Sequence, residues 1–168
     1  MAITKIQSES LNLADNYDFT GTVTGAGEAN TPAWNAYRTT GQGSVGDAFT
    51  KIIFNAETLD TDNAFDTSNG RFTVPTGKGG DYYVYLSFLN NYDQDRKLTL
   101  RLYKNGSGTH RFYDLRTHPK AHHVATIINL SAGDYIEWYY IIEENPVNGV
   151  VDGSGENESK FGGFRIKS

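Results

Sequence analysis

Hydrophobic and polar residues alternate in short runs through most of the chain after about residue 33. The clearest run is 98–103, where three leucines alternate with Thr99, Arg101 and Tyr103. Alternation with a period of two places one set of side chains on one face of a strand and the other set on the opposite face. The run therefore predicts a strand with a buried leucine face and an outer polar face.

Eight runs of this kind, separated by Gly, Asn, Asp and Pro, predict strands, and a ninth lies ahead of them. Short runs punctuated by turn residues are typical of an antiparallel sandwich or barrel. The predicted strands cover residues 33–38, 51–54, 71–74, 82–88, 98–103, 110–115, 124–130, 135–142 and 161–166. A helix longer than one or two turns is hard to place anywhere, so the expected fold class is all-β.

Two predicted strands are apolar or aromatic on both faces. The sequence is Tyr-Tyr-Val-Tyr-Leu at 82–86 and Tyr-Ile-Glu-Trp-Tyr-Tyr-Ile-Ile at 135–142. A strand with this composition is expected to have its outer face covered as well as its inner face. A subunit interface is one way to cover it.

Residues 1–30 have a different pattern, in which apolar side chains are spaced through polar ones and several glycines follow. We interpret this segment as an extended arm with a flexible exit, and residues 31–168 as one domain. The apolar residues of this arm, which are its candidate attachment residues, are Ile3, Ile6, Leu11, Leu13, Tyr17 and Phe19.

Composition narrows the function classes. The 168 residues are 38% hydrophobic and 13% aromatic, which is enough for one sizeable core, and the net charge of -5 argues against a nucleic-acid partner. There is no cysteine, and therefore no disulfide or thiolate nucleophile. The first 13 residues lack the apolar stretch of a secretion signal, and no run approaches the roughly 20 apolar residues that span a bilayer. We expect neither export by such a signal nor membrane insertion.

Motifs of the common catalytic sites are missing from the sequence. The segments 106–108 and 153–155 are Gly-Ser-Gly turns without the Gly-x-Ser-x-Gly spacing of a nucleophile elbow. The glycines within 77–80 lack the Gly-Lys-Ser/Thr ending of a phosphate loop. We predict that the protein is not an enzyme and carries no organic cofactor.

Two groups of residues are candidates for metal binding. The segment 152–158 places oxygen ligands at alternate positions on a glycine-containing loop, which makes Asp152 and Glu156 candidate calcium ligands. A solvated loop explains the same composition. Four histidines also fall close together: His110, His118, His122 and His123. Adjacent residues of a strand face opposite sides, so His122 and His123 are poorly placed to share one ion.

Several segments occur in the order expected of the complement C1q-like domain. Residues 70–75, Gly-Arg-Phe-Thr-Val-Pro, followed by Gly-Asp-Tyr at 80–82, look like the "G-x-F-x-x-P, then G-x-Y" hallmark of that family. Further matching segments lie at 32–37, 53–66, 102–106, 130–136 and 159–164. The chain from 32 to 168 therefore resembles a C1q-like domain.

This resemblance implies a jelly-roll β-sandwich of about ten antiparallel strands, of the C1q/TNF type, that is trimeric about a threefold axis. Its aromatic residues are expected to fill either the core or the trimer interface. The residues predicted for these two places are Trp34, Tyr37, Phe72, Tyr83, Tyr85, Trp138, Tyr140, Phe161 and Phe164.

A second resemblance concerns the arm. Residues 3–15 and 19–27 are similar to leaders of structural proteins from tailed bacteriophages, particularly marine and cyanobacterial phages. This resemblance implies a protein that is made in the host cytoplasm and lies on the virion surface, on the capsid or tail. Its expected role is that of a trimeric decoration (cement) or head-surface protein. The arm residues would attach it to another virion protein, such as the major capsid protein. One alternative is the tip of a tail or head fibre, carried on a fibre shaft, that binds a host glycan or protein receptor. Another is a secreted C1q-like lectin.

Overall fold

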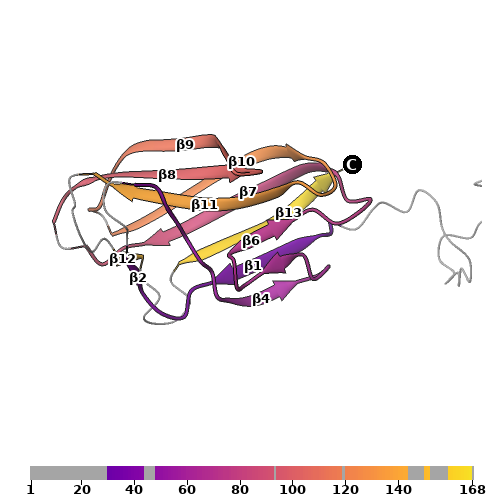
Figure 1. Cartoon of the computed structure of the whole chain (residues 1–168), viewed down its shortest axis with the longest axis horizontal. Coiled ribbons are helices and arrows are strands. Elements are labelled where there is room, and N and C mark those ends of the chain that lie inside the picture. Colours follow the sequence, from indigo (N-terminus) through magenta and orange to yellow (C-terminus); the bar gives the residue numbers. More distant parts are fainter. Residues whose placement is uncertain are drawn as a thin grey trace, which may run out of the picture.

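The computed structural model describes residues 30–43, 48–92, 94–118, 120–143, 150–151 and 159–167. This part of the chain is a sandwich of two antiparallel sheets packed face to face (Figure 1), and it contains no helix. The predicted all-β sandwich of the jelly-roll type is confirmed.

The first sheet has five strands in the order β10-β7-β13-β1-β4. Strand β13 lies in the middle and pairs antiparallel with both β7 and β1, so segments from the two ends of the described chain are neighbours. The strands are β1 (Ala33–Tyr37), β4 (Ala56–Asp60), β7 (Gly80–Leu89), β10 (Ala121–Leu130) and β13 (Lys160–Lys167).

The second sheet follows the order β5-β6-β11-β8-β9, and β3 pairs with β11 beside this path. Its strands are β3 (Thr50–Lys51), β5 (Phe65–Asp66), β6 (Arg71–Thr73), β8 (Lys97–Lys104), β9 (Ser107–Arg116) and β11 (Tyr135–Ile142). A separate small ladder joins β2 (Gln42–Gly43) to β12 (Val150–Val151).

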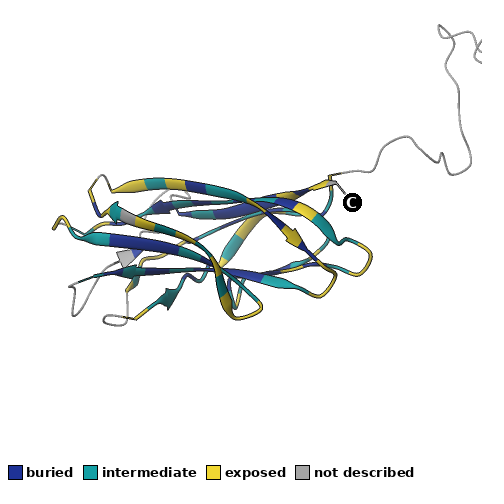
Figure 2. Ribbon diagram, turned by 90° about the horizontal axis from the view of Figure 1, so that it is seen from above, coloured by how far each residue is buried: buried dark blue, intermediate teal, exposed yellow. Residues whose placement is uncertain are grey.

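Aromatic rings hold the two sheets together. Trp34 of β1 stacks on Phe72 of β6 with ring centroids 3.7 Å apart, and the edge of Phe161 on β13 meets Trp34 at 5.7 Å. All three are buried between the sheets, and buried positions alternate along the strands of both layers (Figure 2). Burial of one such ring contributes about 1.5–3 kcal/mol, so this cluster is a major source of stability.

The alternation of buried and outer residues predicted for 98–103 is present in strand β8. Leu98, Leu100 and Leu102 are fully buried. Asn105 and Gly106 then make the turn to β9 with φ values of 52° and 77°. Glycine and asparagine reach this left-handed region more readily than other residues, which explains their place here.

The predicted strand at 51–54 is wrong in extent, because β3 ends at Lys51. Ile52 and Phe54 are fully buried, as alternation predicts. The Ile53 N–H, however, donates to Gln42 Oε1 (2.9 Å), and the Ile53 carbonyl accepts from Arg38. The side chains of Gln42 and Arg38 therefore satisfy the Ile53 backbone groups that a neighbouring strand would otherwise bind.

Candidate functional site

The outer side of the five-stranded sheet carries rings and an aliphatic side chain at neighbouring positions. We call Tyr83, Tyr85, Ile127 and Phe164 the aromatic face. The strand register places Ile127 opposite Tyr83, and Tyr83 opposite Phe164, with the last two ring centroids 5.5 Å apart. Ile127 is 60% exposed and Phe164 is 38% exposed. Three adjacent strands thus contribute to one apolar surface.

A glycine allows Tyr85 to lie across the central strand. Gly162 is opposite Tyr85 in the ladder, and a Cβ added to it would be 2.5 Å from the Tyr85 ring. The Tyr85 hydroxyl reaches over β13 and donates to Asn35 Oδ1 on β1 (2.9 Å). Burial, with a smaller effect of Tyr83, raises the pKa of Tyr85, so this ring stays neutral at physiological pH.

The next residue, Gly163, faces the opposite side of the sheet, toward the core. A Cβ at this position would be 2.6 Å from the Trp34 ring and 2.6 Å from the Tyr83 carbonyl oxygen. Two adjacent glycines therefore allow close approach in two directions, Gly162 on the aromatic face and Gly163 in the core.

The outer side of the six-stranded sheet is charged. The Glu137 side chain is only 3% exposed, and its Oε1 atom accepts from Lys51 Nζ (2.7 Å) and Arg71 Nε (2.8 Å). Its Oε2 atom accepts from the Tyr139 hydroxyl (3.3 Å). Burial opposes ionisation of Glu137, yet the hydrogen bonds from Lys51 and Arg71 outweigh it and lower the pKa of Glu137. This ion network joins β3 and β6 to β11.

Aromatic rings also lie among these charges. The Arg71 guanidinium is 3.8 Å from the Tyr135 ring centroid, and the rings of Tyr103 and Tyr139 are 4.1 Å apart. Burial, followed by the nearby Glu137 carboxylate, raises the pKa of Tyr139 to about 12. We call a group of basic residues on this side, Lys51, Arg71, Arg101 and Arg111, the cationic face.

The nine aromatic residues predicted for the core or an interface divide between the interior of the sandwich and the outer side of the five-stranded sheet. Five are buried between the sheets: Trp34, Phe72, Trp138, Tyr140 and Phe161. Four alternate with buried neighbours and lie on the outer side: Tyr37, Tyr83, Tyr85 and Phe164. Sequence reasoning missed the exposed Leu59, Ile127 and Ile166, although alternation within 124–130 could have indicated Ile127.

Other predicted residues are not part of the described structure. The arm residues Ile3, Ile6, Leu11, Leu13, Tyr17 and Phe19 and the candidate calcium ligands Asp152 and Glu156 lie outside the described residues. Within the described ranges, no group of three His, Cys, Asp or Glu side chains could hold a metal ion. The same ranges hold no helix that is long and apolar enough to cross a membrane.

The histidines lie in separate environments. The Nε2 atoms of His118 and His122 are 3.0 and 2.6 Å from backbone carbonyl oxygens. His123 stacks on Tyr85 at a centroid distance of 5.7 Å, and His110 is on β9 in the other sheet. Their closeness in sequence therefore does not produce a shared site.

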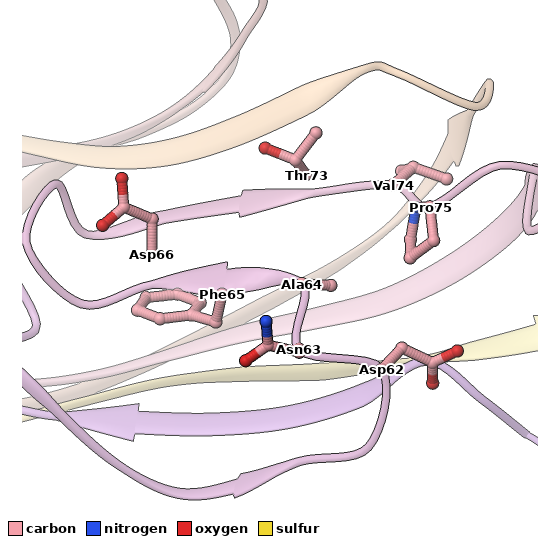
Figure 3. A pocket seen from close by; sticks show the side chains of 8 residues that line it. All are labelled: Asp62, Asn63, Ala64, Phe65, Asp66, Thr73, Val74 and Pro75. Atoms are coloured by element: carbon pink, nitrogen blue, oxygen red, sulfur yellow. The ribbon is translucent and has the colours of Figure 1, made fainter.

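An open hollow of about 520 Å³ lies between the loop before β5 and the end of β6. It is lined by Asp62, Asn63, Ala64, Phe65, Asp66, Thr73, Val74 and Pro75. The Asp62 and Asp66 carboxylates accept hydrogen bonds from adjacent hydroxyl groups (2.6 Å each), and they do not point toward one another (Figure 3). The hollow therefore lacks polar groups that converge on one ligand.

Comparison with known proteins agrees with this architecture. Residues 33–166 match the family model of the C1q domain. No curated protein is significantly similar to the chain in sequence.

Three solved structures illustrate the likeness of fold. The globular domain of the zebrafish complement 1qA protein aligns with a TM-score of 0.56 and 18% identity, covering 81% of this chain and 98% of that chain. The PRD1 vertex protein P5 aligns with a TM-score of 0.65 and 12% identity, covering 83% and 100%. Murine APRIL aligns with a TM-score of 0.55 and 11% identity, covering 80% and 98%.

Proposed function

Because the chain belongs to the C1q domain family, we propose that it is a non-enzymatic phage virion protein that assembles as a homotrimer through the aromatic face. The observation that carries the proposal is the partly exposed row of rings on the outer side of the five-stranded sheet. Its further role is to decorate the particle surface, docked by residues 1–30 on another virion protein such as the major capsid protein.

The chemistry of the aromatic face supports contact between copies. Contiguous exposed apolar patches mark interaction surfaces, and interface cores are enriched in aromatic residues and depleted of charge. Tyr83, Tyr85 and Phe164 form such a patch. C1q/TNF-like domains commonly form homotrimers, and a cyclic arrangement buries this patch on every copy.

Two likenesses support a place on a virion. The PRD1 vertex protein P5, a phage vertex protein, shares the fold over its whole length. The second is the resemblance proposed from the sequence, of residues 3–15 and 19–27 to leaders of tailed-phage structural proteins. A short arm ahead of a trimeric body suits attachment to a particle, with the body projecting outward.

The alternative role is that of a fibre tip that recognises a host glycan or protein. The cationic face favours it, because a trimer joined through the aromatic face leaves the other sheet available to a ligand. Copy number separates the two roles: labelled particles that carry many copies on the head indicate decoration, and a few copies at a fibre end indicate a tip.

Light scattering at micromolar concentration tests the assembly. We expect a mass three times the 18.6 kDa of one chain. A stable monomer at that concentration overturns the trimer. For the virion role, we expect deletion of residues 1–30 to leave a trimer that no longer attaches to particles. If the full-length protein is never found on virus particles, the proposed virion role is wrong.

A further inference from the structure

The strands β8 and β9 place two arginines directly opposite each other. Arg101 pairs with Arg111 in the ladder, so both belong to the outer side of the six-stranded sheet. Like charges at directly opposed positions of a ladder destabilise the pair. Among the described residues, neither guanidinium forms a salt bridge with a carboxylate. Within the described part of the chain, the pair thus lacks a carboxylate counter-charge.

Arg101 is held in a fixed position. A Cβ on Gly108 would overlap the Arg101 guanidinium, so the glycine leaves room for this side chain to lie against β9. Arg101 Nη2 donates to the Gly108 carbonyl (3.1 Å), whereas its buried Nε has no hydrogen-bond partner within the described part of the chain. The guanidinium is 5.4 Å from the Tyr103 ring centroid and 5.7 Å from that of Phe49. A cation positioned in advance loses less entropy when it binds.

An exposed ring borders the pair. Tyr113 is 62% exposed, and the Arg111 guanidinium lies 5.8 Å from its centroid. A tyrosine ring offers a flat apolar surface with a polar edge, and the adjacent guanidinium offers a planar fork of donors. This combination suits a ligand that carries an acidic group next to a ring with apolar C–H faces.

The size of the site restricts the ligand further. The site consists of two arginines and one ring, far fewer residues than the roughly 20–30 per partner of a standard protein interface, and this favours a ligand of one or two sugar units. The guanidinium fork matches a carboxylate through two parallel hydrogen bonds. The whole chain has a net charge of -5, so attraction of an anion here depends on these residues and not on overall charge.

We propose that Arg111 binds the carboxylate of an acidic polysaccharide, that the positive charge of Arg101 beside it strengthens the attraction, and that Tyr113 stacks on the adjoining sugar ring. The site is on the sheet opposite the aromatic face. It depends neither on the trimer nor on attachment to a virion.

Calorimetric titration of the full chain with oligogalacturonate tests this, with uncharged dextran oligosaccharides as the neutral comparison. We expect binding to the acidic sugar alone. Arg111→Gln should weaken it about tenfold, as for the loss of one charge-assisted hydrogen bond. Tyr113→Ala should weaken it about threefold, through the loss of one ring contact. The matched control is Arg116→Gln, which removes the same charge from the same strand at a residue paired with Asp95 (2.9 Å).

Three results overturn the proposal: no binding of oligogalacturonate, equal weakening by the Arg111 and Arg116 variants, or tighter binding of poly-glutamate, which indicates an acidic protein partner. Melting temperatures equal to that of the wild type show that the variants fold. Light scattering on the same samples keeps the result separate from the assembly, because Arg111→Gln should remain a trimer.

Discussion

The two outer faces of the sandwich both carry aromatic rings, but they differ in charge. On the aromatic face, Tyr85 donates a hydrogen bond to Asn35 of the same chain, and its ring lies beside those of Tyr83 and His123. On the cationic face, Glu137 is buried against Lys51 and Arg71, and further arginines lie beside them. Covering neutral rings with a second copy is favourable, whereas covering cations requires their desolvation. The difference favours the aromatic face for the contact between copies that we propose, and it leaves the other sheet open to solvent and ligands.

The largest effect is expected from a charge placed on the aromatic face. Phe164→Glu introduces one carboxylate per copy into a surface of neutral rings, and we expect the trimer to be lost at micromolar concentration. The matched control is Tyr113→Glu, which changes an exposed ring of the other sheet and should leave the trimer intact. Light scattering measures both variants. A trimeric Phe164→Glu, or a monomeric Tyr113→Glu, contradicts the division between the faces.

The next effect concerns the ion network on the cationic face. Glu137→Gln leaves Lys51 and Arg71 without their carboxylate, and we expect a loss of about 3 kcal/mol in the free energy of unfolding, the lower end for a broken buried pair. Lys51 and Arg71 keep some solvent access, 20% and 31%, which limits the loss.

Glu57→Gln, an exposed position on β4, is the control for the ion network and should change stability little. Chemical denaturation at one fixed protein concentration measures both variants, because association also stabilises the folded state. Equal effects at the two positions rule out a stabilising network around Glu137.

The adjacent glycines separate folding from association. Gly163→Ala inserts a methyl group beside Trp34 and the backbone of β7, and we expect a cost of about 2 kcal/mol with the trimer retained. Gly162→Ala pushes the Tyr85 ring off β13, and we expect weaker association with a smaller change in melting temperature. Thermal melting and light scattering on dilution distinguish the two. If the two variants change melting temperature and association by the same amounts, core packing and association are not separable at these two glycines.

The smallest effect is expected at Asp134, in the turn before β11. Hydrogen bonds from Lys104, Asn105 and the Ser131 backbone lower the pKa of Asp134 to about 2. The ordinary value is about 3.9, so the stabilisation is present above this value and is lost as pH falls through the folded-state pKa. Asp134→Asn should therefore be less stable than wild type at neutral pH, with a difference that shrinks between about pH 4 and pH 2. Denaturation midpoints across this range measure the effect, and a constant difference contradicts it.

Strands that bury one face along their own length could be predicted from sequence. The predicted ranges for β7, β8, β11 and β13 agree with the structure to within two residues. Strand β4 was not predicted, because none of its five residues is buried and its sequence therefore carries no alternation. The structure forms β4 by pairing it with β1, a contact that local pattern does not show.

The candidate sites show the same limit. The aromatic composition of 82–86 indicated that an outer face is covered, but not which rings point outward. Glu137 lies in an aromatic run, and the residues that neutralise it, Lys51 and Arg71, are 86 and 66 positions away. The pairing of Arg101 with Arg111 depends on register shifts between β8 and β9 on both sides of that position. Such shifts arise from packing and not from a local motif.

The central place of β13 has a consequence for the order of events during synthesis. Strands β1, β7 and β10 leave the ribosome first, but β7 and β1 have no ladder between them until residues 160–167 enter the gap. Because Phe164 and Gly162 arrive with that strand, the aromatic face is incomplete until β13 has joined the sheet. We therefore expect copies to associate only after β13 is in place.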